Sequence, residues 1–295
     1  MNWWIDDIRF LGHSMVEVTV LGIAQDGGHP QPGCLRPCCA NLTEHHFPVS
    51  LGVRSDEGIN ILIEATRHLG DQFTLWGQTH VDHLLLTHAH FGHVDGLGLF
   101  GRETLSAQGI QLHISEEMYH LVDQTPQWNL MVQQGVFEIQ TFAVDAALYN
   151  KGALSIEPIR IPHRDELSDM HAFIIRGPNK SLLFLPDHDT WGETLAVHKC
   201  STLRQWLSAM RIDIALIDGT FWSEDELGGR DQSKVPHPPV LQTLNMLGER
   251  EYGDPEIFFT HLNHTNPLYD QDSEQMKQVV QLGWGVVHQG QRFTL

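Results

Sequence analysis

The stretch Leu84-Leu-Leu-Thr-His-Ala-His-Phe-Gly-His93 decides how this chain is interpreted, because an apolar run passes directly into a cluster of three histidines. His88, His90 and His93 would all lose hydration together if they served only to fill space at the end of a strand. Neutral imidazole nitrogens at such a turn are instead ready metal ligands. The glycine-rich segment 94–98 follows, which is typical of a loop beyond a strand. We therefore predict a metal site at the end of a buried strand.

The composition limits the partners that this chain can bind. Eighteen basic and 37 acidic residues give the 295-residue chain a net charge of −19, which argues against nucleic acid and against an anionic membrane surface. The length is enough for a large core, and we expect a single domain over residues 1–295. A small-molecule substrate is the expected partner. The oligomeric state stays open, with a homodimer among the alternatives.

The expected location is the cytoplasm. The segment Met1–Asp7 is acidic and amphipathic and lacks the basic start and apolar stretch of a signal peptide, and no membrane span is predicted. Three of the four cysteines lie within residues 34–39, a spacing unlike that of a secreted disulfide framework.

The chain alternates between strand-like and helix-like segments throughout, which predicts a mixed α/β protein with two halves. A long loop rich in glycine and proline is expected at 22–48, and Thr190 and Glu193 have the spacing of a capping box at a helix start. Strands are predicted at 14–21, 49–55, 59–65, 81–87, 110–114, 135–142, 153–161, 171–177, 181–185, 213–218, 256–260 and 284–288. Helices are predicted at 67–77, 95–107, 115–124, from Thr190 onward, at 238–248 and at 270–281.

Three more predicted strands end in a side chain that can bind a metal. His163 follows the strand that ends at Ile161, Asp187 follows the apolar run 182–185, and His261 follows the run 257–260. Each has an ordinary explanation when taken alone. Together with the histidine cluster they form a repeated pattern, since functional residues gather where strands pass into loops.

In the order of these residues along the chain, the protein resembles the metallo-β-lactamase superfamily over nearly its whole length. More narrowly, it is similar to the branch of pyrroloquinoline quinone biosynthesis B proteins. The stretches that carry this resemblance are Leu21-Gly-Ile-Ala-Gln-Asp-Gly-Gly-His29, the cluster Cys34–Cys39, Ile217-Asp-Gly-Thr220, His237-Pro238 and Thr260-His-Leu-Asn-His-Thr-Asn-Pro267. The resemblance implies an α/β (α+β) fold with four layers in the order αββα, two mixed β-sheets flanked by helices.

The resemblance also implies two metal positions at one edge of the sandwich. His88, His90 and His163 would hold the first metal, Asp187 would bridge, and His93 and His261 would hold the second. The superfamily's first motif usually reads H-x-H-x-D-H, whereas this chain has Gly92 at the aspartate position. A glycine supplies neither charge nor ligand.

Two outcomes follow from Gly92. The second position is weak or empty, leaving three histidines and Asp187 as a site for zinc or iron, or another carboxylate replaces the missing one. Asp95 is closest in sequence, and Asp189 is a rival that we favour instead as a residue at the helix entry. Asp218, at the end of the strand 213–218, is a candidate partner of a metal-bound imidazole. The sequence leaves the roles of His188 and His237 undecided.

The cysteine cluster predicts a separate, structural zinc. Cys34, Cys38 and Cys39 suit a tetrahedral site completed by a fourth ligand from elsewhere. The resemblance to phosphodiesterases of the superfamily implies that His264 is this ligand, with His29, His45 and His46 as rival donors. The alternative is a set of reduced, buried thiols. Cys200 is expected to pack within a helix.

The leading functional hypothesis is metal-dependent hydrolysis of an ester or phosphodiester bond in a small molecule, with Asp187, Asp95 and Asp218 as the catalytic carboxylates. Zinc is the expected metal in the cysteine site and a candidate for the active site, where iron and manganese are alternatives. A second hypothesis, implied by the resemblance, is iron-dependent oxygenation of an amino-acid-derived precursor. A third is a non-catalytic carrier of a small molecule.

Overall fold

The computed structural model describes residues 15–40, 42–143, 146–227 and 235–295. The expectations for Met1–Asp7, and for a first strand that begins at Ser14, lie outside the described residues. The first strand is described from Val16.

Two seven-stranded mixed sheets form the centre of the molecule. The first sheet has the strand order β14 (Arg292–Thr294), β1 (Val16–Gly22), β2 (Ser50–Ser55), β3 (Asn60–Ile63), β4 (His83–Leu85), β5 (Ile110–Ser115) and β6 (Phe137–Phe142). The second has the order β13 (Gly285–Val286), β12 (Glu256–Thr260), β11 (Ile214–Asp218), β10 (Ser181–Leu185), β9 (Met170–Arg176), β8 (Leu154–Ile161) and β7 (Tyr149–Lys151).

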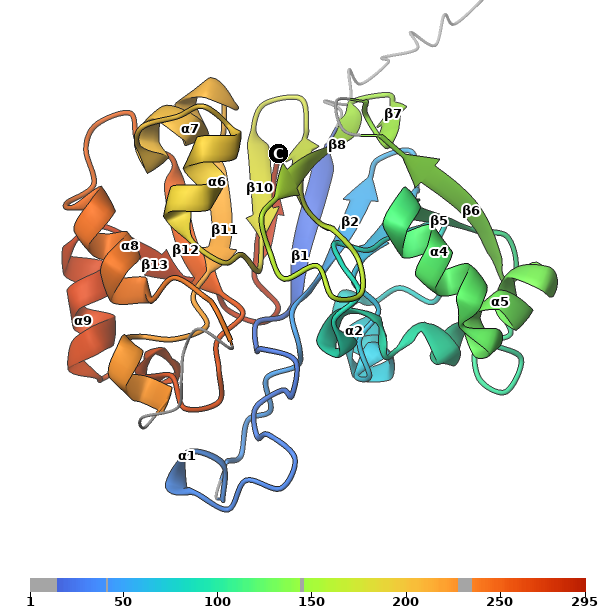
Figure 1. Cartoon of the computed structure of the whole chain (residues 1–295), viewed down its shortest axis with the longest axis horizontal. Helices are drawn as coiled ribbons and strands as arrows, with labels where there is room; N and C mark the ends of the chain where they lie inside the picture. The colour runs from blue at the N-terminus through green and yellow to red at the C-terminus, as the bar shows by residue number, and fades with distance from the viewer. Residues whose placement is uncertain (1–14, 41, 144–145, 228–234) are drawn as a thin grey trace, which may run out of the picture.

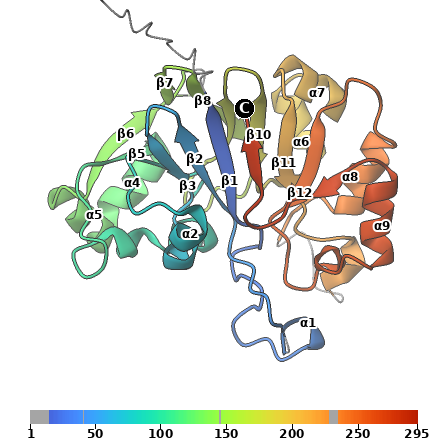
Figure 2. The same cartoon turned by 180° about the vertical axis from the view of Figure 1, so that it is seen from behind.

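Helices cover the outer face of each sheet, so the fold has the predicted four-layer αββα order (Figure 1, Figure 2). The first sheet is covered by α2 (Leu69–Trp76), α4 (Glu116–Gln124) and α5 (Pro126–Gln133). The second is covered by α6 (Trp191–Val197), α7 (Leu203–Ala209), α8 (Val240–Leu247) and α9 (Glu274–Gln281). The short α1 (Pro37–Ala40) lies in an arm that projects from the sandwich, and α3 (Phe91–Val94) follows β4.

The core between the sheets follows from the alternation of side chains along each strand. Val18 and Leu51 of the first sheet and Phe173 and Phe184 of the second are fully buried in one cluster. Two further clusters fill the spaces between each sheet and its helices. Each such buried side chain stabilises the fold by roughly 1.5–3 kcal/mol, so the positions of the strand ends are firmly held.

The strand directions bring several strand ends to one edge. β10, β11 and β12 are parallel neighbours, and β8 runs in the same direction as β10 because both are antiparallel to β9. β3, β4, β5 and β6 are likewise parallel. The residues that directly follow β4, β8, β10 and β12 therefore meet at the same edge of the sandwich.

Most predicted elements are present, with boundaries shifted by a few residues. The helix expected at 95–107 is wrong, because α3 ends before it at Val94 and only a 3-10 turn, η1 (Leu97–Phe100), forms among these residues. The chain at Gly96 packs directly on the backbone of Thr66, and Ser106 has a positive φ of 50°, which a continuous helix does not allow.

Other expectations need smaller corrections. The helix expected at 270–281 begins at Glu274, with Ser273 as its N-cap. Cys200 does not lie in a helix but between α6 and α7, where Lys199 has a positive φ of 55°. Six of the observed α-helices and β-strands were not predicted from the sequence, namely α1, α3, α5, α7, β7 and β14. The Thr190 cap is confirmed, since its hydroxyl accepts a hydrogen bond from the Glu193 N–H.

Further elements are the 3-10 turns η2 (Glu224–Leu227) and η4 (Pro267–Tyr269). Within the described ranges, no helix has both the length and the apolar character needed to cross a membrane.

Candidate metal centre

A group of three histidines and one aspartate meets at the edge where the strands end. His88 Nε2 lies 2.9 Å from His90 Nδ1, and His163 Nε2 lies 3.2 Å from the same atom. Asp187 Oδ2 lies 3.5 Å from His88 Nε2 and 3.4 Å from His163 Nε2. Two ligands of one zinc ion are about 2.9 to 3.4 Å apart, given metal–nitrogen distances of about 2.0–2.1 Å. The spacing of this group, which we call the first ligand group, fits a single metal ion.

Asp187 lies between the first ligand group and His93, whose Nε2 is 4.0 Å from Asp187 Oδ2. It follows β10, is buried, and its Oδ1 has no hydrogen-bond partner among the described residues. Burial opposes its ionisation, but His163 and His237 beside it hold the pKa of the Asp187 carboxyl well below its usual range. Burial, with a smaller contribution from His93, holds the pKa of His88 well below its ordinary value. Burial is also the largest cause that lowers the pKa of His90 to about 4. His88 and His90 are therefore neutral imidazoles beside an ionised carboxylate, which is the protonation state that metal binding needs.

A second ligand group lies beside the first. Asp26 Oδ1 is 3.5 Å from His93 Nε2 and 3.8 Å from His261 Nε2, and His93 Nε2 is 4.0 Å from Asp187 Oδ2. All three ligand atoms of Asp26, His93 and His261 are buried and lack hydrogen-bond partners in the described part of the chain. Buried polar atoms are almost always satisfied in native proteins. Their convergence on one point fits a bound cation.

The electrostatics of this second group also favour positive charge. Burial opposes protonation of His93, yet the carboxylates of Glu64, Asp26 and Asp187 outweigh it and raise the pKa of His93 to about 9. A metal ion on Nε2 would take the place of that proton.

Two outer carboxylates fix the orientation of the histidines. Asp189 Oδ1 accepts a hydrogen bond from His163 Nδ1 at 2.9 Å. Glu64 Oε1 lies 3.1 Å from His93 Nδ1 and accepts a hydrogen bond from the Thr87 hydroxyl. Such contacts set which ring nitrogen faces the metal. Asp189 directly precedes the Thr190 cap of α6, as predicted, and lies outside the ligand groups of the described residues, but the sequence did not predict its contact with His163.

Asp218 and His237 form a buried pair next to Asp187. His237 Nδ1 lies 2.7 Å from Asp218 Oδ2 and 3.1 Å from Asp187 Oδ1. The second Asp218 oxygen accepts hydrogen bonds from the Thr220 N–H and hydroxyl. Burial opposes protonation of His237, but Asp218 and Asp187 outweigh it and raise its pKa to about 9. Asp218 thus contacts an imidazole of the site, while His188 turns away and its Nδ1 contacts Thr194.

Asp26 places a carboxylate next to Gly92, and its Oδ1 lies 3.5 Å from His93 Nε2. Asp95, the candidate replacement nearest in sequence, pairs instead with Arg67 at 2.5 Å and lies outside the ligand groups that the described residues form. Asp26 lies within the Leu21–His29 stretch, where the sequence alone indicates no role for it. The Asp-Gly-Gly sequence of residues 26–28 was the available signal, since glycines allow a loop to approach other backbone closely.

The cysteine cluster gathers around His264 at the base of the arm. Cys39 Sγ lies 3.3 Å and Cys38 Sγ 3.7 Å from His264 Nδ1, and the two sulfurs are 3.9 Å apart. Cys34 completes a group whose ligand atoms all lie within 4.8 Å of one another. Thiolates on a tetrahedral zinc are about 3.8 Å apart, so the geometry fits the predicted structural zinc. Among the rival donors, His29 contacts the Cys38 carbonyl oxygen and stacks on Tyr269.

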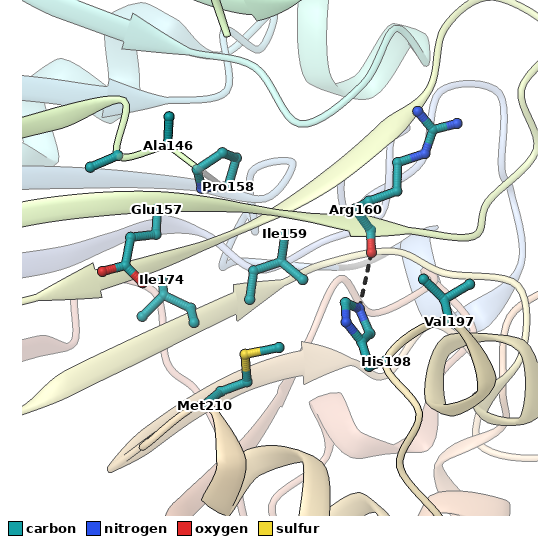
Figure 3. A pocket seen from close by; sticks show the side chains of 10 residues that line it. Ala146, Glu157, Pro158, Ile159, Arg160, Ile174, Val197, His198 and Met210 are labelled. Carbon is teal, nitrogen blue, oxygen red and sulfur yellow. Dashed lines mark hydrogen bonds between the residues drawn. The ribbon is translucent and has the colours of Figure 1, made fainter. Parts of the chain in front are cut away.

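An open depression of about 320 Å³ borders both ligand groups. Asp26 and His90 form its floor, and the exposed Phe91 and Leu167 and the charged Arg164 and Glu166 form its rim. A different pocket, of about 450 Å³, lies between β8, β9 and the α6–α7 region, where His198 Nε2 donates to the Arg160 carbonyl oxygen (Figure 3). Its described lining residues include no member of the ligand groups, whereas the depression is lined by Asp26 and His90.

The fold and the site together define the class of protein. Residues 59–262 match the model of the beta-lactamase superfamily domain, and the chain belongs to that family. Within it, the chain is similar to coenzyme PQQ synthesis protein B. It is 26% identical to that protein from Xanthomonas oryzae pv. oryzae over 312 residues, which cover 95% of this chain and 100% of the relative. The protein of the same name from Methylobacterium sp. is 24% identical over 316 residues, with the same coverage.

Solved structures show the same fold. Zn(2+)-bound PqqB from Methylobacterium extorquens has a TM-score of 0.74 at 21% identity and covers 95% of this chain and 100% of its own. A diphosphatase of the PhnP family has a TM-score of 0.67 at 18% identity, covering 95% and 97%. Human tRNase Z, short form, has a TM-score of 0.55 at 13% identity, covering 94% and 98%. The fold neighbours thus include hydrolases.

Proposed function

We propose that this protein is a metal-dependent hydrolase that cleaves an ester or phosphodiester bond in a small molecule. The observation that carries the proposal is the pair of adjacent ligand groups, in which Asp187 Oδ2 of the first lies 4.0 Å from His93 Nε2 of the second. Asp26 and His90, one from each group, line an open depression. A metal ion bound there would supply a hydroxide at neutral pH and polarise the carbonyl or phosphoryl oxygen under attack. Zinc and manganese are the metals that we expect in hydrolysis.

The fold and the outer carboxylates position the metal ligands. The ligands follow the ends of β4, β8, β10 and β12, so packing of the sheets fixes their relative positions. Asp189 and Glu64 orient His163 and His93 through their Nδ1 atoms. Precise placement of ligands by such outer contacts is worth about 10–100-fold in metal affinity or activity.

We assign His237 the handling of the proton that the leaving group needs. Asp218 and Thr220 hold the ring by its Nδ1 next to Asp187. The ring is thus oriented without being a member of the first ligand group, and a positioned acid contributes about 10²–10⁴-fold to turnover. Asp218 then acts through His237 and is a positioning residue.

The test is a screen of p-nitrophenyl esters and bis(p-nitrophenyl) phosphate with wild type, His88→Ala and Asp187→Asn, each loaded with zinc or manganese. Wild type is expected to turn over one of these classes, and both variants are expected to lose the activity together with active-site metal. His120→Ala, at an exposed helix position, is the matched control. Full retention of metal and activity in both site variants would overturn the proposal.

A second candidate is iron-dependent oxygenation of an amino-acid-derived precursor. It is supported by the similarity to coenzyme PQQ synthesis proteins and by a group of histidines with one carboxylate, which also suits ferrous iron. Anaerobic loading with Fe(II), followed by measurement of O2 uptake with candidate precursors, separates the two. Uptake that depends on His88 would favour oxygenation over hydrolysis.

A further inference from the structure

We infer that Asp26 is a metal ligand of the second site and supplies, from a different part of the chain, the carboxylate that Gly92 lacks. This inference deepens the proposed function and rests on it. It gives the site two metal ions rather than one: His88, His90 and His163 for the first, Asp26, His93 and His261 for the second, and Asp187 between them.

The first argument is the set of unsatisfied atoms. Oδ1 of Asp26 and Nε2 of both His93 and His261 are buried without hydrogen-bond partners among the described residues, and they lie within 4.8 Å of one another. The Asp26 side chain is partly exposed, so water is accessible to its carboxylate. It instead points one oxygen at two imidazoles. A carboxylate and two imidazole nitrogens are a common donor set for zinc and manganese.

The second argument is that Gly92 leaves the space that Asp26 fills. An ideal Cβ at residue 92 would lie 2.7 Å from the Asp26 Cβ, and closer still to its Cα and Oδ1. No side chain at position 92 fits while Asp26 holds its place. The glycine at the aspartate position of the usual H-x-H-x-D-H pattern and the position of Asp26 are therefore sterically linked: the carboxylate comes from the loop after β1 instead of from α3.

The third argument is that the Asp26 loop is tied to the chain that carries His261. The Gln25 N–H donates to the Leu262 carbonyl oxygen at 2.9 Å, and the Leu262 N–H donates to the Ile23 carbonyl oxygen at 2.8 Å. The Gly28 N–H closes a tight turn on the Gln25 carbonyl oxygen at 2.7 Å. These backbone bonds hold Asp26 opposite His261 without help from a metal, so the donor set is preorganised.

The experiment counts metal equivalents in the purified full-length protein by elemental analysis after loading with zinc and dialysis. Wild type is expected to hold one equivalent more than Asp26→Ala. Gly92→Ala is the decisive variant, because residue 92 offers no ligand atom, yet an added methyl group would displace Asp26. It is expected to lose the same equivalent. Gly98→Ala is the matched control, since an ideal Cβ there has no atom within 4 Å, and it should keep the wild-type count.

The outcomes separate this inference from the proposed function. Wild-type metal content in Asp26→Ala would overturn the inference, as would a wild-type protein with one active-site equivalent that depends on His88. In that last case hydrolysis by a single metal site would stand. Circular dichroism and retention of the cysteine-bound zinc check that Gly92→Ala folds. If Gly92→Ala does not fold, Asp26→Asn replaces it as the test, because it keeps the shape of the side chain but not its charge. The inference then requires that this variant lose at least 10-fold in affinity for the second metal.

Discussion

Glu64 Oε1 lies 3.1 Å from His93 Nδ1, and both side chains are completely buried. Glu64 follows β3 and adopts a positive φ of 71°, an uncommon conformation for a residue with a Cβ. Its oxygens also accept hydrogen bonds from the Thr87 hydroxyl and N–H, so it links the turn after β4 to His93. One buried carboxylate thus supports two parts of the histidine cluster.

Replacing Glu64 by glutamine should weaken metal binding at the second ligand group by about 10–100-fold. The amide has one acceptor oxygen for three donors, and its NH2 group would face either Thr87 or His93. Competition with a chelator measures the effect. Glu157→Gln, which removes a partner of Arg176 outside the metal groups, is the control. Equal affinity in both variants would show that Glu64 does not orient His93.

Asp189→Ala should weaken metal binding at the first ligand group, because His163 loses the acceptor that fixes its Nδ1. A loss of about 10-fold or more is expected. Asp189→Asn keeps an acceptor oxygen and should restore most of the affinity. The dissociation rate of cobalt, followed by its absorption, provides the measurement, and equally fast release from both variants would argue for a role of charge rather than orientation.

Cys39→Ser and His264→Ala should each remove one zinc equivalent and lower the Tm by several degrees. Both residues lie in the group with Cys34 and Cys38, and together they join the arm to the segment after β12. Cys200→Ser serves as the control, since Cys200 lies outside that group. Zinc analysis and thermal unfolding check this. An unchanged zinc content in His264→Ala would point to another fourth ligand.

Acid should destabilise the protein partly through His113. Burial, with a smaller contribution from His83, lowers the pKa of His113 to about 4, against 6.5 for an ordinary histidine. Between these values the unfolded chain takes up a proton that the folded chain does not. The contribution of His113 to stability is therefore complete above about pH 6.5, falls as the pH falls, and is lost near pH 4, with a total on the order of 3 kcal/mol.

The check is urea unfolding at several pH values. Between pH 6.5 and 4, the unfolding free energy of His113→Gln should fall less steeply with decreasing pH than that of wild type. His120→Gln, at an exposed position of α4, should have the same slope as wild type. Identical slopes for His113→Gln and wild type would contradict the assignment.

The sequence by itself predicted the architecture and most of the residues that gather in the two ligand groups. Alternating strands and apolar runs such as 182–185 are local patterns that tertiary packing did not override, and His88, His163, Asp187 and His261 each follow such a run directly. Their convergence followed from strand direction, since neighbouring parallel strands end at the same edge. His264 followed only from the resemblance, because no local pattern marks it.

Tertiary structure alone decided which carboxylates join the site. Asp95 and Asp189 are close in sequence to predicted ligands, yet Asp95 turns to Arg67 and Asp189 to the outer side of His163. Asp26 lies 67 positions before His93 in the chain, and only the backbone bonds between its loop and Leu262 bring it there. Sequence distance does not report such contacts, because they depend on how two loops from different sheets meet. Gly92 could thus be recognised from the sequence as a missing carboxylate, whereas its replacement by Asp26 required the folded chain.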